Sequence, residues 1–168
     1  MLYNYIMQWE EITNIILIAA IAVLGVFALM GLIEWIKRKS LFKVDKELLA
    51  MIPSLVIMLI TYLIFDKIFI LNTRPDGSGK PSFPSSHVMA TTTIFLMVML
   101  ALPKYIKSKP LRIFLDVIMF VLIILISAGR VLSQMHWVSD VAAGLIFALI
   151  FTAIYYLIRK FANKENHE

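Results

Sequence analysis

The 168-residue chain contains no cysteine, only six glycines and six prolines, and few charged residues. The absence of cysteine excludes disulfides, thiolate metal sites and cysteine nucleophiles. The low glycine and proline content excludes a collagen-like or linker-like chain. Charged residues make up 16% of the chain, against about 25% in an ordinary soluble domain, and 61% of residues are hydrophobic. This composition excludes a disordered chain and argues against a water-exposed surface.

Five long apolar runs follow one another along the sequence. Each has at most one charged residue and about the length that a helix needs to cross the roughly 30 Å hydrocarbon core of a bilayer. The runs cover residues 12–36, 48–65, 85–102, 113–129 and 141–158. We therefore predict an all-α, polytopic membrane helix bundle with five transmembrane helices, forming a single domain over residues 1–168. Residues 1–11 are expected to lie in the membrane interface. The alternative, a soluble helical bundle, would have almost no polar face.

The basic residues are distributed unevenly between the two ends of this predicted bundle. Twelve fall on one side: Lys37, Arg38, Lys39, Lys43, Lys46, Lys104, Lys107, Lys109, Arg112, Arg159, Lys160 and Lys164. Four fall on the other: Lys67, Arg74, Lys80 and Arg130. Because basic loops stay in the cytoplasm, the N-terminus is predicted outside and the C-terminus in the cytoplasm. The formal charge of +5 then reflects orientation in the membrane, and nucleic-acid binding is not expected.

The outer side carries an unusual set of polar residues in two loops and the adjoining helix ends. Read in order, they are Lys67, Arg74 and Pro75, then Pro84, Ser85, Ser86 and His87, then Arg130, His136 and Asp140. Each has an ordinary interpretation, such as an interface lysine, a loop cation, a buried histidine or a helix-surface pair. Together, however, they place several polar groups near hydrocarbon. Placing a charged group there raises the free energy of the folded protein, so residues of this kind usually have a function.

The spacing of these residues resembles the three motifs of the type 2 phosphatidic acid phosphatase family, the integral-membrane lipid phosphate phosphatases. The motifs are Lys-x6-Arg-Pro, Pro-Ser-Gly-His and Ser-Arg-x5-His-x3-Asp, and they fall between residues 67 and 140. This sequence departs from them at Ser86, which replaces a glycine, and at Gly129, which replaces a serine. It also has five predicted helices where many members have six. No departure removes a residue that the chemistry needs.

The resemblance implies a role for each motif residue. His136 would be the nucleophile, Asp140 would accept the proton of its other ring nitrogen, and His87 would protonate the leaving group and then activate water. Three cations would bracket the phosphoryl oxygens, helped by two serines at the start of the third helix that cap it or donate to phosphate. These phosphate-binding candidates are Lys67, Arg74, Arg130, Ser85 and Ser86. No metal ion or other cofactor is expected.

The predicted function is therefore a lipid phosphatase in a bacterial inner membrane with its site facing outward. The family's candidate substrates are undecaprenyl pyrophosphate, phosphatidylglycerophosphate, lipid A 1-phosphate and phosphatidic acid. A small multi-pass transporter or assembly subunit is the alternative, although no inverted repeat or pair of broken helices is present. A vanadate-dependent haloperoxidase has a related anion pocket but lacks five hydrophobic spans. Substrate choice and oligomeric state stay open.

Overall fold

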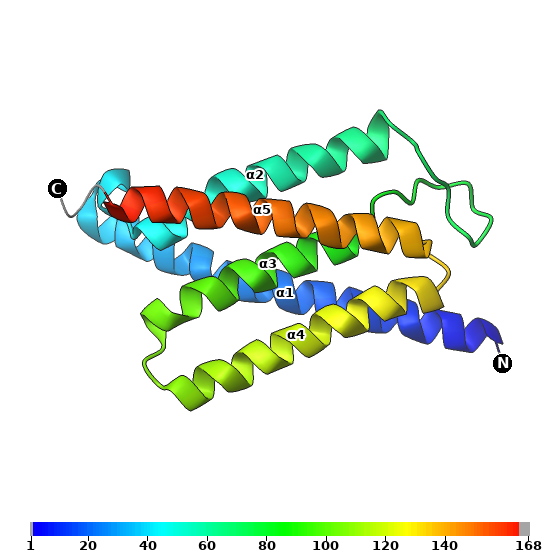
Figure 1. The fold of residues 1–168 in the computed structure, drawn as a ribbon, viewed down its shortest axis with the longest axis horizontal. Coiled ribbons are helices and arrows are strands. Elements are labelled where there is room, and N and C mark those ends of the chain that lie inside the picture. Colours follow the sequence, from blue (N-terminus) through cyan, green and yellow to red (C-terminus); the bar gives the residue numbers. More distant parts are fainter. Residues whose placement is uncertain (1, 165–168) are drawn as a thin grey trace.

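The computed structural model describes residues 2–164 and is entirely helical apart from its loops (Figure 1). Within that range there is no β strand, only an isolated bridge between Thr73 and Pro81. The helices are α1 (Leu2–Arg38), the short 3₁₀ helix η1 (Leu41–Lys43), α2 (Lys46–Lys67), α3 (Ser86–Tyr105), α4 (Lys109–Leu132) and α5 (Val138–Lys164).

Five of these helices are long and apolar enough to cross a membrane, which confirms the predicted all-α bundle and its number of spans. The third predicted run starts one residue before α3, and each of the others lies inside its helix. The clearest extension is in α1, which runs for 37 residues and is therefore about 55 Å long. Residues 2–11, which were predicted as an interfacial segment, continue α1 without a break. Their interfacial placement stays a prediction.

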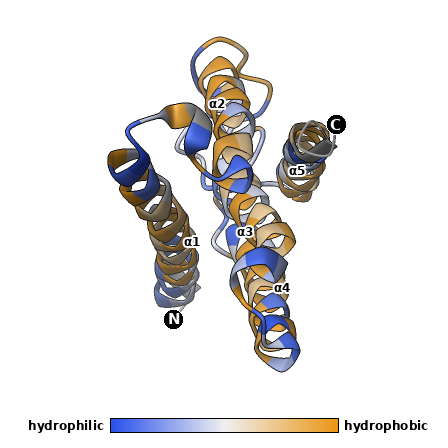
Figure 2. Ribbon diagram, turned by 90° about the vertical axis from the view of Figure 1, so that its left-hand side faces the viewer, coloured by the Kyte–Doolittle hydropathy of each residue, from blue (hydrophilic) through white to orange (hydrophobic). Residues whose placement is uncertain are grey.

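Helix α3 lies at the centre of the bundle. It packs against α5, α4 and α1, whereas α2 packs chiefly against α5 (Figure 1). Most α3 side chains are buried, including Phe95 and Met97. The other helices expose large apolar side chains, such as Ile15 and Ile18 of α1. Figure 2 shows hydrophobic residues along most of each helix and hydrophilic residues mainly near the helix ends. These outward apolar faces suit a multi-pass membrane protein.

Successive helices run in opposite directions, so the loops lie at the two ends of the bundle (Figure 1), where the hydrophilic residues are also concentrated (Figure 2). We call one the site end; it comprises the start of α1, the loops 68–85 and 133–137, and the helix ends that flank these loops. We call the other the basic end; it comprises η1, the α3–α4 loop and the end of α5. The site end therefore gathers every motif segment that the sequence predicted to meet on one side of the membrane.

The basic end is held together by paired charges. Glu47, which is 3% exposed, accepts hydrogen bonds from Tyr155 Oη at 2.9 Å and pairs with Arg159 Nε at 2.9 Å. A second carboxylate, Asp45, caps α2 through the Glu47 backbone N–H and also pairs with Lys104. The buried Glu47 and the partly buried Asp45 thus each have a cationic partner, as an ion pair removed from water requires.

Candidate active site

A cavity of about 170 Å³ opens at the site end between α2, α3 and the two loops. Its lining includes Arg74, Ser86, His87 and His136 from the predicted set. The remaining lining residues are Tyr62, Phe65, Asp66, Pro81, Ser82, Phe83 and Pro84. Arg130 does not line the cavity, but its Nη2 lies 3.3 Å from Nε2 of His136. Segments that are distant in the sequence therefore meet around one small, polar space.

His136 is buried, 4% exposed, and both of its ring nitrogens have partners. Nδ1 lies 2.7 Å from the Ser82 carbonyl oxygen, which can only accept, so Nδ1 carries the proton. Nε2 then has a free lone pair, and Arg130 Nη2 donates to it at 3.3 Å. Burial and the neighbouring Arg130 lower the pKa of His136 to about 4. The imidazole is therefore neutral at pH 7, with Nε2 as its available electron pair.

Asp140 differs from its predicted role as direct acceptor of the His136 proton. Its Oδ2 is 3.9 Å from Nδ1, which is too long for a hydrogen bond. The carboxylate instead accepts from the Trp137 backbone N–H at 3.0 Å and from Asn72 Nδ2 at 2.9 Å. Asp140 therefore caps the start of α5 and ties it to the α2–α3 loop, while a backbone carbonyl fixes the tautomer of His136.

His87 and Arg130 are both held by the first helix. His87 Nε2 lies 3.0 Å from Asn14 Oδ1. Arg130, 2% exposed, donates from Nη1 to Thr13 Oγ1 at 3.3 Å. Neither α1 residue belongs to a predicted motif.

The site contains buried donors that no described residue satisfies. Arg74 Nε and Arg130 Nε are both buried without a hydrogen-bond partner, as are two serine hydroxyls, Ser82 Oγ and Ser85 Oγ. Buried polar groups are normally paired, so unpaired guanidinium donors beside a cavity are suited to an anion. Within residues 2–164, no three His, Asp or Glu side chains are grouped closely enough to hold a metal ion.

The two serines lie at the start of α3 as predicted. Ser85 is the N-cap residue, but its hydroxyl makes no capping hydrogen bond, and its backbone N–H donates to the Asp140 carbonyl oxygen at 3.0 Å. The hydroxyl is thus free to act as a donor. Ser86 lies in the first helical turn and lines the cavity, without the positive φ that would favour glycine. Serine at position 86 therefore causes no backbone strain.

Gly129 faces helix α1 and not the cavity. A Cβ atom at this position would lie 2.5 Å from Thr13 Cγ2 and 3.1 Å from the Trp9 ring. These distances are too short for a side chain, so a serine would force α1 away from α4. The glycine here is explained by the close approach of two helices.

Lys67, like Arg130, does not line the cavity, but unlike Arg130 it is exposed. Its side chain is 72% exposed and pairs with Asp66 at 2.7 Å. It lies in the last turn of α2, a helix that packs mainly on α5. Its predicted contact with phosphate therefore has no geometric support here, and the role stays a prediction.

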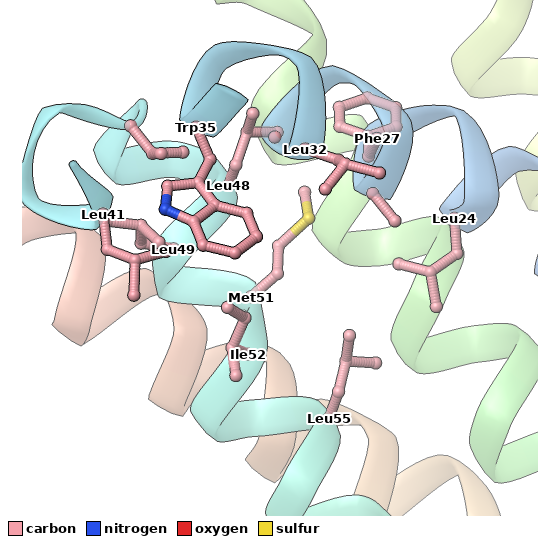
Figure 3. A pocket seen from close by; sticks show the side chains of 13 residues that line it. Leu24, Phe27, Leu32, Trp35, Leu41, Leu48, Leu49, Met51, Ile52 and Leu55 are labelled. Atoms are coloured by element: carbon pink, nitrogen blue, oxygen red, sulfur yellow. The ribbon is translucent and has the colours of Figure 1, made fainter. Parts of the chain in front are cut away.

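A larger cavity of about 280 Å³ lies between α1 and α2 near the basic end (Figure 3). Its lining is almost entirely aliphatic and aromatic, with Trp35, Phe27 and Met51 pointing into it (Figure 3). It has no titratable or nucleophilic side chain and lies at the end of the bundle remote from His136. Chemistry, not size, therefore identifies the smaller cavity as the candidate active site.

Sequence reasoning missed four residues that support the site: Thr13, Asn14, Asn72 and Ser82. Asn72 and Ser82 lie in a Gly-, Pro- and Ser-rich loop, and no spacing pattern distinguishes them. Thr13 and Asn14 did give a signal, because they are adjacent polar residues inside an apolar run. Polar groups within a membrane span mark functional positions.

The fold is that of a multi-pass helical membrane protein, and comparison with known proteins identifies its family. Residues 53–164 match the PAP2 superfamily, and the chain belongs to this family. The chain is also similar to the crystal structure of a transmembrane PAP2-type phosphatidylglycerolphosphate phosphatase from Bacillus subtilis. The TM-score is 0.66 at 21% identity, over 95% of this chain and 77% of that one. A comparison with curated proteins gave no match.

Proposed function

We propose that this protein is a lipid phosphatase that hydrolyses a lipid phosphate or pyrophosphate through a phosphohistidine intermediate. The observation that carries the proposal is the neutral His136, whose Nε2 lone pair lies beside a guanidinium at the rim of an anion-sized cavity. Membership of the PAP2 superfamily supports the phosphatase class.

In the first step, His136 Nε2 attacks phosphorus and the bond from phosphorus to the lipid oxygen breaks. The lipid oxygen takes a proton from the protonated His87. Arg130, which donates to Nε2 in the resting site, turns that donor toward the phosphoryl oxygens as substrate binds. Arg74 adds a second planar guanidinium, and such donors bind phosphate strongly because they make charge-assisted pairs.

In the second step, water attacks the phosphohistidine and the nitrogen–phosphorus bond breaks. His87, now neutral, takes a proton from the water, and inorganic phosphate leaves. The same group thus acts first as an acid and then as a base. Buried cations stabilise the charge of both transition states, so the proposed reaction needs no metal ion.

We place the site end at the extracytoplasmic face of a bacterial inner membrane. The motivation is the excess of Lys and Arg at the basic end, which the positive-inside rule assigns to the cytoplasm. The proposed substrates present a phosphate at headgroup depth: undecaprenyl pyrophosphate, phosphatidylglycerophosphate, lipid A 1-phosphate or phosphatidic acid. The B. subtilis protein named above acts on the second of these.

The test is release of inorganic phosphate from these four lipids by purified protein in detergent with excess EDTA. We expect release from at least one lipid that survives EDTA and is lost in His136→Ala. Wild-type protein that releases no phosphate from any of the four would contradict the proposed function and favour a non-catalytic membrane subunit. Full activity of His136→Ala would contradict the assigned nucleophile.

A further inference from the structure

Helix α1 contributes two adjacent polar side chains to the site, although it lies outside the residues 53–164 that match the family. Thr13 is fully buried against α4, and Asn14 is partly buried against α3. Adjacent residues of a helix point about 100° apart. One turn of α1 can therefore reach two neighbouring helices at once.

Resting on the proposed function, we propose that Asn14 and Thr13 are positioning residues of the phosphatase site. Asn14 orients His87 and fixes which of its nitrogens exchanges protons with substrate. Thr13 orients the guanidinium of Arg130. In this protein the site is thus completed by the first helix as well as by the three motifs.

The contact between Asn14 and His87 defines a tautomer. Asn14 Oδ1 lies 3.0 Å from His87 Nε2, and an amide oxygen can only accept, so Nε2 carries the proton. His87 lines the cavity whereas Asn14 does not. With Nε2 engaged by Asn14, Nδ1 is the nitrogen left to exchange protons with the lipid oxygen and water. Partners of this kind set the orientation of functional histidines.

The contact between Thr13 and Arg130 is directional as well. The Thr13 hydroxyl donates to the Glu10 carbonyl oxygen at 2.9 Å. Its lone pairs are then left to accept from Arg130 Nη1 at 3.3 Å. The other terminal nitrogen, Nη2, faces His136. In the resting site the planar guanidinium thus lies between a helix α1 hydroxyl and the proposed nucleophile.

Gly129 makes this arrangement possible. Any side chain there would collide with Thr13, because its Cβ would lie 2.5 Å from Thr13 Cγ2. The family motif has a serine at this position, and here the residue is glycine. The hydroxyl beside Arg130 comes instead from Thr13 on a different helix. Glycine at position 129 thus leaves the space that the Thr13 side chain needs in order to reach Arg130.

For Asn14 the test is Asn14→Leu, which keeps the size of the side chain and removes the acceptor. With a lipid substrate we expect kcat to fall about 10- to 100-fold, as when the partner of a functional histidine is lost, with little change in KM. With p-nitrophenyl phosphate, whose leaving group needs little protonation, formation of phosphohistidine is spared and its hydrolysis slows. Acid-labile phosphate on the protein should therefore accumulate above the wild-type level.

For Thr13 the matched pair is Thr13→Val and Thr13→Ser. Valine keeps the shape and removes the hydroxyl, so we expect KM for the lipid phosphate to rise about tenfold or more because the guanidinium loses its orientation. Serine keeps the hydroxyl and should restore wild-type KM. Ile15→Ala, on the same turn but facing outward at 64% exposed, is the control and should change neither constant.

These outcomes separate a positioning role from a purely structural one. A structural role would lower the thermal midpoint and the yield of folded protein while leaving kcat, KM and the phosphohistidine level of the folded fraction unchanged; that result would overturn the inference. So would equal KM values for Thr13→Val and Thr13→Ser. Absence of phosphate release by the wild type would instead refute the proposed function.

Discussion

The two polar ends of the bundle differ in how their charged side chains are paired. At the basic end, Glu47 and Asp45 each pair with a cation and a tyrosine hydroxyl. At the site end, Arg130 is buried and Arg74 is half-buried, and neither pairs with a carboxylate of residues 2–164. Each has a buried Nε donor that no described residue accepts. Satisfied buried charges hold helices together, whereas unsatisfied buried donors lower stability and serve binding. Paired charges at the basic end therefore stabilise the fold, whereas unpaired donors at the site end are available to a ligand.

The largest loss of activity at the site end is expected for His136→Ala. It removes the proposed nucleophile, so we expect phosphate release to fall by about 10⁴-fold or more, in the range seen for nucleophile removal in other hydrolases. The measurement is the initial rate of phosphate release, with circular dichroism to show that the variant is folded. A loss of less than tenfold would contradict the role of His136.

Arg130→Lys tests whether the site needs a planar guanidinium. Lysine keeps the charge but cannot contact Thr13, His136 and phosphate together. We expect kcat/KM to fall about 10²- to 10³-fold, similar to the loss of a transition-state hydrogen bond. If the lysine variant keeps wild-type kcat/KM, charge alone would be sufficient and the geometric account would be wrong.

Glu47→Gln probes the basic end and should have the reverse outcome. It removes the carboxylate that pairs with Arg159, which keeps its hydrogen bond to the Leu100 carbonyl oxygen. Breaking a largely buried ion pair in this way costs up to about 3 kcal/mol. We expect a lower thermal midpoint in detergent, while kcat and KM of the folded protein stay at wild-type values. A selective loss of kcat without a change in stability would mean that the two ends are coupled.

Lys67→Ala has a smaller expected effect than either arginine variant. The lysine is exposed, pairs with Asp66 and does not line the cavity. We expect kcat/KM to fall less than tenfold, and Arg74→Ala, measured in parallel, to show a much larger loss. Equal losses would show that Lys67 moves to the substrate during turnover.

The smallest expected effect is that of mild acid on His136. Because burial lowers its pKa to about 4, the ring stays neutral between pH 7 and pH 5, where a free histidine would become charged. Its contribution to stability is complete above about pH 6.5 and is lost as pH falls toward 4. Nitrogen NMR of labelled histidine would show this titration directly. A midpoint near 6.5 would contradict the buried, neutral ring.

Much of the fold followed from the sequence because long apolar runs have few alternatives. The five spans were confirmed, with each helix extending into its polar flanks. The start of α1 was harder to predict, since Trp9 and Thr13 pack closely against Gly129 of α4. Local composition contains no information about such a contact between distant residues.

The site was predictable in its motif residues but not in their partners. The i, i+4 spacing of His136 and Asp140 indicated a direct contact. The imidazole N–H instead donates to the Ser82 carbonyl oxygen. The Asp140 carboxylate accepts hydrogen bonds from Trp137 and Asn72. Spacing defines which residues share a helix face. It does not identify a backbone carbonyl from another loop.

The central claim is best tested by trapping the covalent intermediate. Purified protein would be mixed with radiolabelled lipid phosphate, quenched in base within one turnover, and digested to locate the label. We predict acid-labile, base-stable phosphate on His136 in the wild type and none in His136→Ala. With labelled p-nitrophenyl phosphate, whose leaving group needs little protonation, we predict a higher level in His87→Asn, which lacks the base for hydrolysis. Rapid turnover with no label on His136, or label on His87 instead, would contradict the account.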